Sequence, residues 1–291
     1  MLCYIILNYN DSKTTKNCVE SIRNFNSIDH IIIVDNSSTD DSYEKLLLLI
    51  DSKVDVIRTS HNGGYGSGNN YGVLYAKEKY NPDLIVISNP DVLIQEDSVI
   101  ECMNFLLSHQ DATIAVPLML DNEENPCFNC VWKVPTYIQY LLFSLYVCGK
   151  FVKSNNYSKD LFDQSKPFKC DCVAGSWLMS KTECFIQSGM YDESIFLYCE
   201  ETVLGIRMKR LEYNCYVIPY ISFIHKHSVS VNKTIKSKYQ QQKLMWKSRK
   251  YVLDNYYKRG LMFRILTSVI QFIGLFEYKL RTLYHTKLLH R

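Results

Sequence analysis

The sequence lacks a strong excess of charge of one sign. Its 291 residues carry 33 lysines and arginines against 30 aspartates and glutamates, which leaves a net charge of +3. A protein dedicated to nucleic acid shows a pronounced basic patch, so this balance argues against nucleic acid as a partner. Internal repeats and low-complexity tracts are also missing. Hydrophobic residues make up 47% of the chain, which is enough for one large domain or two small ones.

Long hydrophobic runs are scarce as well. The best candidate for a membrane span, Leu261–Phe276, is short and carries Arg264 and Gln271, whereas a spanning helix needs about 20 apolar residues. Tyr137–Cys148 is apolar but shorter still. We therefore expect no transmembrane helix, although either segment can lie in a membrane interface. Strand-like sequence begins at Leu2, so we expect no signal peptide and a cytoplasmic location, with the inner face of the cell membrane as an option.

The eleven cysteines follow no regular spacing. We interpret them as reduced cytosolic thiols, several of them in the core. Cys127-x-x-Cys130 and Cys170-x-Cys172 offer four sulfurs for an alternative zinc site, but the second pair has the wrong spacing for a zinc knuckle.

Apolar runs alternate with helix-like segments in the first half of the chain. The expected strands are Cys3–Leu7, Ile31–Val34, Val54–Arg58, Leu84–Ser88 and Thr113–Val116. The expected helices are Ser12–Phe25, a segment ending in Leu46–Ile50, Asn69–Lys79 and Glu96–Ser108. This spacing is typical of βαβ units, so we predict an α/β fold with a doubly wound, mostly parallel sheet and helices on both faces.

The second half is less regular. Leu118–Lys169 shows no clear period, and we expect loops and short helices there that can cover the site. The later expected elements are strands at Cys172–Ser180 and Cys215–Ile218 and helices at Thr182–Ser188, Glu200–Leu211, Lys236–Tyr257 and Leu261–Leu289. Pro117 and Pro219 are expected to end the strands that precede them, because proline cannot donate a ladder hydrogen bond.

Polar residues follow three of the expected strands. Asn8, Tyr9 and Asn10 follow the first, Asp35 the second, and Asn89-Pro90-Asp91 the fourth. Since parallel strands end at one edge of the sheet, these loops should converge into a ligand site. Asp91 can hold a hard divalent cation there. The alternatives are local: Asp91 caps the next helix, and Asp35 forms an Asx-turn or a cap.

The loop from Asn62 to Gly72 is rich in glycine and asparagine. It suggests a dinucleotide fingerprint, but it follows the third strand and its spacing is not GxGxxG. Glycines here more simply let the backbone approach a ligand, with N–H groups at a helix N-terminus for its oxygens. A flexible surface loop is the alternative.

Paired carboxylates, Glu200 and Glu201, open a later helix. They either complement the helix dipole or supply a general base that accepts a proton from a substrate hydroxyl. Further on, His225 and His227 flank Lys226, which makes contact with a metal or a phosphate plausible.

These motifs together resemble family 2 glycosyltransferases with the GT-A fold, and within them the rhamnosyltransferase-like branch of bacterial surface polysaccharide synthesis. The resemblance covers Leu2 to about Ser230. It is carried by Asn8-Tyr9-Asn10, Val34-Asp35-Asn36-Ser37-Ser38, the Asn62–Gly72 loop, Asn89-Pro90-Asp91, the stretch from Tyr191 to Glu201, and His225.

The resemblance implies inverting transfer of rhamnose or another hexose from a dTDP- or UDP-sugar to a hydroxyl of a glycan or lipid-linked acceptor. Asp91 and His225 would hold Mn²⁺ or Mg²⁺, and Glu201 or its neighbour Glu200 would be the base. Asn89 stands where the family's metal motif has an acid. The expected nucleotide-sugar site consists of Asn8, Tyr9, Asn10, Asp35, Asn62, Gly63, Asn70, Asn89, Gly175 and Ser176.

The C-terminal part, residues 231–291, is expected to be a helical segment beyond a catalytic domain of residues 1–230. Phe263, Leu266, Ile270, Ile273 and Leu280 can share one face, near Lys279, Arg281 and Lys287. Such a face suits a membrane surface, a homodimer contact or a core. Two other functions are open: a catalytically inactive nucleotide-binding interaction protein and an NAD-dependent oxidoreductase.

Overall fold

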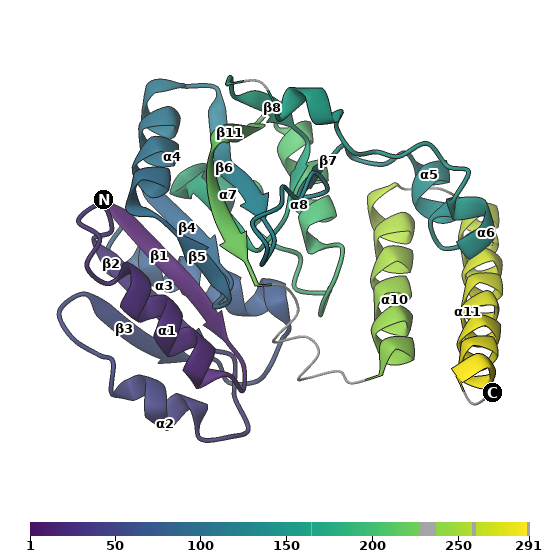
Figure 1. The fold of residues 1–291 in the computed structure, drawn as a ribbon, viewed down its shortest axis with the longest axis horizontal. Coiled ribbons are helices and arrows are strands. Elements are labelled where there is room, and N and C mark those ends of the chain that lie inside the picture. The colour runs from purple at the N-terminus through teal and green to yellow at the C-terminus, as the bar shows by residue number, and fades with distance from the viewer. Residues whose placement is uncertain (164, 227–236, 258–259, 290–291) are drawn as a thin grey trace.

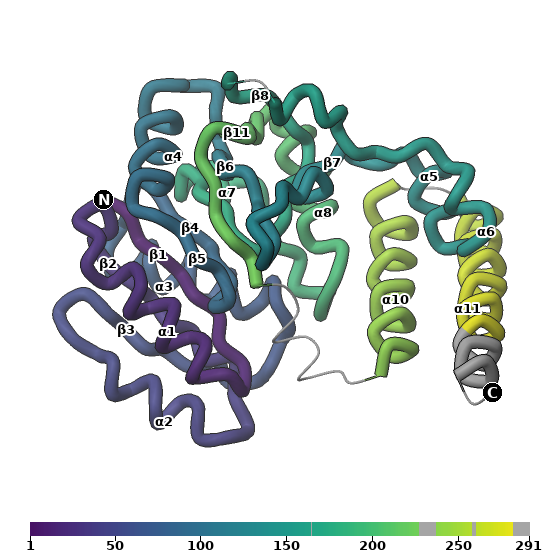
Figure 2. Tube along the Cα trace, in the orientation of Figure 1, coloured from purple at the N-terminus to yellow at the C-terminus, as the bar shows by residue number. Residues whose placement is uncertain are grey.

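The computed structural model of this protein describes residues 1–163, 165–226, 237–257 and 260–289. Figure 1 shows a body built around one twisted sheet, with a layer of C-terminal helices beside it. Figure 2 follows the chain from the sheet into the short helices next to the C-terminal layer and back again. The boundary expected between residues 230 and 231 falls outside the described residues.

A nine-stranded mixed sheet forms the centre of the protein. Along the sheet its strands are β3 (Val54–Arg58), β2 (His30–Asp35), β1 (Leu2–Asn8), β4 (Leu84–Ser88), β10 (Trp177–Lys181), β6 (Ala112–Leu120), β11 (Asn214–His225) and β5 (Val92–Ile94), with β8 (Phe168–Cys170) paired to β11. The first four are parallel to one another. Since both faces of β1, β2 and β4 are covered, their sequences are nearly continuous apolar runs. The predicted α/β fold is confirmed.

Helices cover both faces of the sheet, with α1 in front and α3 behind in Figure 1. Those around the sheet are α1 (Ser12–Ile22), α2 (Ser42–Leu47), α3 (Tyr65–Lys79), α4 (Glu96–Ser108), α7 (Thr182–Gln187) and α8 (Glu200–Arg210). Gly72 lets α3 lie close to the sheet, because a Cβ there would sit 2.7 Å from side-chain carbons of Ile5 and Val34.

The remaining elements belong to the region that breaks the alternation and to the C-terminus. They are β7 (Val131–Trp132), which pairs with β9 (Cys172–Val173), α5 (Tyr137–Leu142), α6 (Tyr146–Gly149), a 3₁₀ turn at Lys159–Leu161, α10 (Lys238–Tyr256) and α11 (Leu261–Leu289). A second hydrophobic cluster joins α5, α8 and α10 around Val203 and Val252. α10 therefore packs against the main body as well as against α11.

The two prolines expected to end strands lie inside strands. Pro117 sits within β6, where β10 pairs only with Ile114 and Ala115, so Pro117 has a paired neighbour on one side alone. Pro219 sits within β11, at a break in register between Ile218 and Ser222. Both predictions are wrong because proline is tolerated where the ladder is one-sided or irregular.

Several boundaries also differ from expectation. The Cys172–Ser180 strand is split into β9 and β10, and β10 runs antiparallel to β4 and β6. α3 begins at Tyr65 rather than Asn69, so most of the glycine-rich stretch is helical. The three-residue strand β5 carries too short a pattern to be predicted from sequence.

Helix α11 is continuous past Phe276, which changes the expectation for the membrane. Its segment Leu261–Arg281, 21 residues, is long and apolar enough to cross a membrane by length and composition, and most of it is exposed. The expectation that this segment is too short is therefore wrong, because the helix continues past Phe276. Ile270 of the expected apolar face packs against the second hydrophobic cluster, whereas Leu266 and Ile273 are exposed. Lys287 lies outside the residues whose side chains are described.

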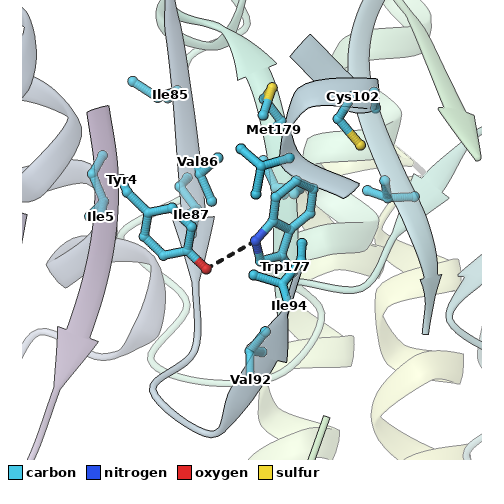
Figure 3. Packing of buried hydrophobic residues seen from close by; sticks show 14 of the residues in the cluster. Tyr4, Ile5, Ile85, Val86, Ile87, Val92, Ile94, Cys102, Trp177 and Met179 are labelled. Atoms are coloured by element: carbon cyan, nitrogen blue, oxygen red, sulfur yellow. Dashed lines mark hydrogen bonds between the residues drawn. The ribbon is translucent and has the colours of Figure 1, made fainter. Parts of the chain in front are cut away.

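Replacing Tyr4 by Phe should lower the free energy of unfolding by about 1–3 kcal/mol. Trp177 of β10 donates its indole N–H to the Tyr4 hydroxyl of β1 at 3.0 Å across β4, and both side chains are fully buried (Figure 3). The substitution leaves a buried donor without its acceptor. Urea unfolding measures the effect, and Tyr71→Phe at an exposed tyrosine is the matched control. Equal stabilities for the two variants would show that the bond contributes nothing.

Candidate functional site

A cavity of about 360 Å³ opens where β1 and β4 end and α8 begins. Nine of the predicted site residues line it: Tyr9, Asn62, Asn89, Asp91, Gly175, Ser176, Glu200, Glu201 and His225. Open α/β sheets bind ligands at this edge. The convergence expected from the order of the motifs is thus present, and groups from both halves of the chain share one space.

Asp91 and His225 face each other in this cavity. The Oδ1 atom of Asp91 lies 3.2 Å from Nε2 of His225, and the Asn89 side-chain nitrogen lies 3.4 Å from that same Nε2. The pairing of β5 with β11 produces this contact, because it sets His225 opposite Val92. The alternative in which Asp91 caps the next helix is wrong, since β5 intervenes and Gln95 occupies the N-cap of α4.

Asp35 is buried beside the cavity and does not line it. Its carboxylate accepts hydrogen bonds from the Asn8 side chain at 2.9 Å and the Ser38 backbone N–H at 3.0 Å, and Arg58 lies 3.4 Å away. The bond to Ser38 is the kind of local turn contact that the alternative interpretation describes. In this structure Asp35 joins the loops after β1 and β2.

Four other predicted residues also lie outside the lining. Asn8 donates a hydrogen bond to Asp35, and Asn10 forms hydrogen bonds with Thr39 in the next loop. Asn70 is buried in α3 and bonds to the backbone of Tyr191 in both directions. Gly63 precedes α3. The position of Asn8 and Asn10 at the sheet edge was predicted. Their hydrogen bonds join neighbouring loops, and those of Asn70 join α3 to the chain at Tyr191.

The start of α3 docks on the loop that precedes α8. Gly64 has φ of +94°, and a Cβ there would lie 2.0 Å from the carbonyl oxygen of Phe196. The backbone N–H of Tyr65 donates to that same oxygen at 3.0 Å. Asn36 donates to the Gly64 carbonyl at 3.0 Å. Gly64 therefore permits a close approach to protein backbone, and the predicted approach of this loop to a ligand stays a prediction.

Ten lining residues were not among the predicted ones. They are Leu7, Asn36, Gly64, Tyr65, Pro90, Met119, Ala174, Phe196, Leu197 and Tyr198. Seven of them lie within the motifs that carry the family resemblance: Asn36, Gly64, Tyr65, Pro90, Phe196, Leu197 and Tyr198. Met119 lies in the half of β6 beyond Pro117, so the mistaken end of that strand concealed it.

The two glutamates lie at the first turn of α8. Tyr198 and Cys199 just before them both have left-handed φ angles, 69° and 74°. Non-glycine residues rarely adopt this conformation, and it gathers at functional sites. Glu200 is 2% exposed, and its Oε2 atom has no hydrogen-bond partner among the described residues. The Gly175 backbone N–H donates to Oε1 of Glu201 at 3.4 Å.

Burial raises the pKa of both carboxyl groups. For Glu200 the negative charge of Glu201 adds to the effect of burial, and its pKa lies well above the usual value. The pKa of Glu201 is raised by burial, while backbone N–H groups, including that of Gly175, oppose the shift. A carboxylate with a raised pKa that faces a cavity is suited to accept a proton.

Helix α10 holds the loop that carries these glutamates. Tyr251 and Tyr256 donate their hydroxyls to Oδ2 of Asp192, at 3.1 and 2.5 Å. Ser248 donates to the Leu197 carbonyl at 2.7 Å. The C-terminal segment therefore contributes to the geometry of the cavity without lining it.

The protein supplies only some of the ligands that a divalent cation would need in this cavity. Among the described residues there is no group of three or more His, Cys, Asp or Glu placed to hold a metal, which also leaves the four-cysteine zinc site without support. Asp91 and His225 offer one oxygen and one nitrogen ligand, a pair that Mn²⁺ accepts. Phosphate oxygens and water would complete such a site, as is usual where a cation bridges phosphates.

The sheet and the position of its cavity define the GT-A class of glycosyltransferase folds. The chain superimposes on the mannosyltransferase PcManGT from Pyrobaculum calidifontis, solved with GDP-Man and Mn²⁺, with a TM-score of 0.58 and 11% identity. The match covers 89% of this chain and 64% of that one. The likeness shows the fold.

The chain belongs to glycosyl transferase family 2, whose model matches residues 3–177. It is 26% identical to rhamnosyltransferase WbbL of Escherichia coli (strain K12) over 167 residues, which is 56% of this chain and 60% of that protein. It is 27% identical to the low-salt glycan biosynthesis hexosyltransferase Agl10 of Haloferax volcanii over 241 residues, 82% of this chain and 71% of that protein. The family that the motifs predict is confirmed, and it gives no support to the oxidoreductase alternative.

Proposed function

We propose that the protein transfers a hexose from a nucleotide-diphosphate sugar to a hydroxyl of a glycan or lipid-linked acceptor, with inversion at the anomeric carbon. One observation carries the proposal: a single cavity holds Asp91 and His225 together with Glu200 and Glu201. The first pair suits the diphosphate end of a donor and the second suits proton removal from an acceptor. The names of the relatives, a rhamnosyltransferase and a hexosyltransferase, support a hexose such as rhamnose as the sugar. The choice of dTDP or UDP as its nucleotide comes from the family resemblance of the motifs.

The cation in this proposal is Mn²⁺ or Mg²⁺, held by Asp91 and His225. When bound, it would offset the negative charge that builds on the departing diphosphate. Asn89 lies beside this pair, with its side-chain nitrogen 3.4 Å from Nε2 of His225. The amide in place of an acid lowers the negative charge of the site, so the donor's own phosphates would have to supply the remaining charged ligands.

The base in this proposal is Glu201, with Glu200 as the alternative. Glu201 is the less buried of the two, and Gly175 holds one of its oxygens. Its carboxylate removes the proton from the acceptor hydroxyl while the hydroxyl oxygen attacks the anomeric carbon. The bond to the nucleotide diphosphate breaks on the opposite face, so a single displacement inverts the configuration. Burial and the charge of Glu201 raise the pKa of Glu200 well above its usual value, so Glu200 holds a proton more readily and the negative charge resides on Glu201.

We divide the chain into a catalytic part, residues 1–230, and a C-terminal helical part, residues 231–291. The second part packs on the first through α10 and exposes the apolar side of α11. A lipid-linked acceptor at a membrane surface would be close to such a helix.

Binding of nucleotide sugars tests the proposal. We expect a thermal-shift panel with Mn²⁺ to show a rise in Tm for dTDP- or UDP-linked hexoses and for the matching diphosphate, with a smaller rise when EDTA replaces the metal. NADH should cause none. Slow hydrolysis of the same donor separates an enzyme from an inactive nucleotide-binding protein. Binding without any hydrolysis or transfer would favour the inactive alternative, and no binding at all would contradict the proposal.

A further inference from the structure

A second cavity lies between α6, α10 and α11. Its volume is about 330 Å³, and none of the residues that line it lines the first cavity. Its lining includes Ser144, Tyr146, Lys150, Trp246 and Arg281. The proposed sugar transfer uses none of them, so this cavity is available to a different ligand.

Two cations share one aromatic ring at this cavity. The Arg281 guanidinium carbon lies 3.3 Å from the centroid of the Tyr146 ring, and Lys150 Nζ lies 4.4 Å from it. The pKa of Tyr146 is lowered by its hydrogen bond with Lys150 and by the positive charge of Arg281. The carboxylate of Glu277 is also near, and it accepts the Tyr146 backbone N–H at 2.7 Å. The local charge thus favours an anion.

The inner wall of the cavity also offers hydrogen-bond donors. Trp246 is buried, and its indole N–H has no acceptor among the described residues. Ser144 is buried beside it, and Arg249 lies 3.5 Å from the Ser144 hydroxyl. Buried donors normally have acceptors, so an oxygen-rich ligand would satisfy a group that the protein leaves unsatisfied.

The surroundings of the cavity are apolar and exposed. Val147 and Phe151 are exposed on and just after α6. On α11, Phe272, Phe276 and Leu280 are exposed and recur every four residues, so they share one helix face. An anion site with an exposed apolar border fits a molecule that carries both a phosphate and hydrocarbon chains, which favours a membrane lipid over a soluble phosphate.

We propose that the cavity between α6, α10 and α11 binds the phosphate of a membrane lipid headgroup. Arg281 and Lys150 contact the phosphate, and the exposed residues of α6 and α11 rest against the acyl region. The site is separate from the sugar-transfer cavity, so it anchors the protein at an anionic membrane surface independently of whether transfer occurs.

Vesicle flotation of the full chain tests this site. We expect binding to phosphatidylcholine vesicles that contain phosphatidylglycerol, and weaker binding to vesicles in which oleate supplies the same negative charge without a phosphate. Lys150→Gln/Arg281→Gln should weaken the first interaction roughly 30-fold, from two basic contacts. The matched control is Lys243→Gln/Lys247→Gln, which removes the same charge from exposed positions of α10 and should cost much less.

Other results would overturn the proposal. Equal losses of vesicle binding in the two double variants would show long-range attraction between the protein's charge and the membrane rather than a specific site. Equal binding to oleate and phosphatidylglycerol vesicles would show that the phosphate is not recognised. If inorganic phosphate raises Tm but the protein does not bind vesicles, the cavity binds a soluble anion instead. If the protein does not bind vesicles and Lys150→Gln/Arg281→Gln changes its mass in solution, this face is a dimer contact. Nucleotide-sugar binding should be the same in all variants, which separates failure here from failure of the proposed function.

Discussion

Replacing Glu201 by Gln is expected to lower kcat by about 10²–10⁴-fold, the usual contribution of a general base. The amide preserves the shape of the side chain but cannot accept the proton of the acceptor hydroxyl. Because Glu201 stands apart from Asp91 and His225 in the proposal, donor binding measured by calorimetry should be unchanged. Glu78→Gln, at an exposed position of α3, is the matched control and should retain full turnover.

The two glutamates can be told apart with the same measurements. If Glu201 is the base, Glu200→Gln should reduce turnover less than Glu201→Gln. If Glu200 is the base, the order reverses, and near-normal transfer by both variants removes the pair from the mechanism. In the wild type the acidic limb of the kcat/KM profile should lie above the usual pH for a glutamate, because burial raises the pKa of both groups.

The raised pKa values should also make the folded protein more stable at low pH than at neutral pH. A carboxyl whose pKa is raised in the folded state stabilises the fold at low pH, below its unfolded pKa, and that contribution is lost as pH rises through the folded pKa. At neutral pH Glu200 is therefore a buried group that opposes folding, and Glu200→Gln should raise Tm there. This gain would diminish on acidification, where the wild-type carboxyl is itself protonated.

Asp91→Asn should remove most of the metal dependence of donor binding. Loss of a residue that merely orients a metal ligand costs about 10–100-fold in metal affinity, so loss of the ligand should cost at least as much. Calorimetry of the matching nucleoside diphosphate, with and without Mn²⁺, measures the effect. Wild-type affinity should rise with Mn²⁺, and that of the variant should hardly change.

Asp97→Asn, on the exposed side of α4, is the control for the lost charge and should respond to Mn²⁺ as the wild type does. An Asp91→Asn variant that keeps the full response would exclude Asp91 as a ligand. His225→Gln provides a second check, because it removes the nitrogen that lies 3.2 Å from Asp91 and should weaken the response in the same direction.

Much of the fold was predictable because its parallel strands are covered on both faces. β1, β2 and β4 are short apolar runs with polar residues at their carboxyl ends, and one helix separates each strand from the next between β1 and β4. Short elements and interrupted ones were not predictable. β5 has three residues, and the prolines in β6 and β11 suggested strand ends, because the sequence does not show which side of a strand is paired.

The candidate site also has features that the sequence predicts and features that it does not. By itself the sequence determined that Asn89, Asp91 and the loops after β1 and β2 reach one edge of a sheet, because each lies directly after a buried parallel strand. Only the tertiary structure decided that Asp91 lines the cavity while Asp35 is enclosed, that β5 brings His225 to Asp91, and that α10 holds the loop before Glu200. These outcomes depend on contacts between segments far apart in the chain, and no local period or cap encodes which of two similar carboxylates such contacts will cover.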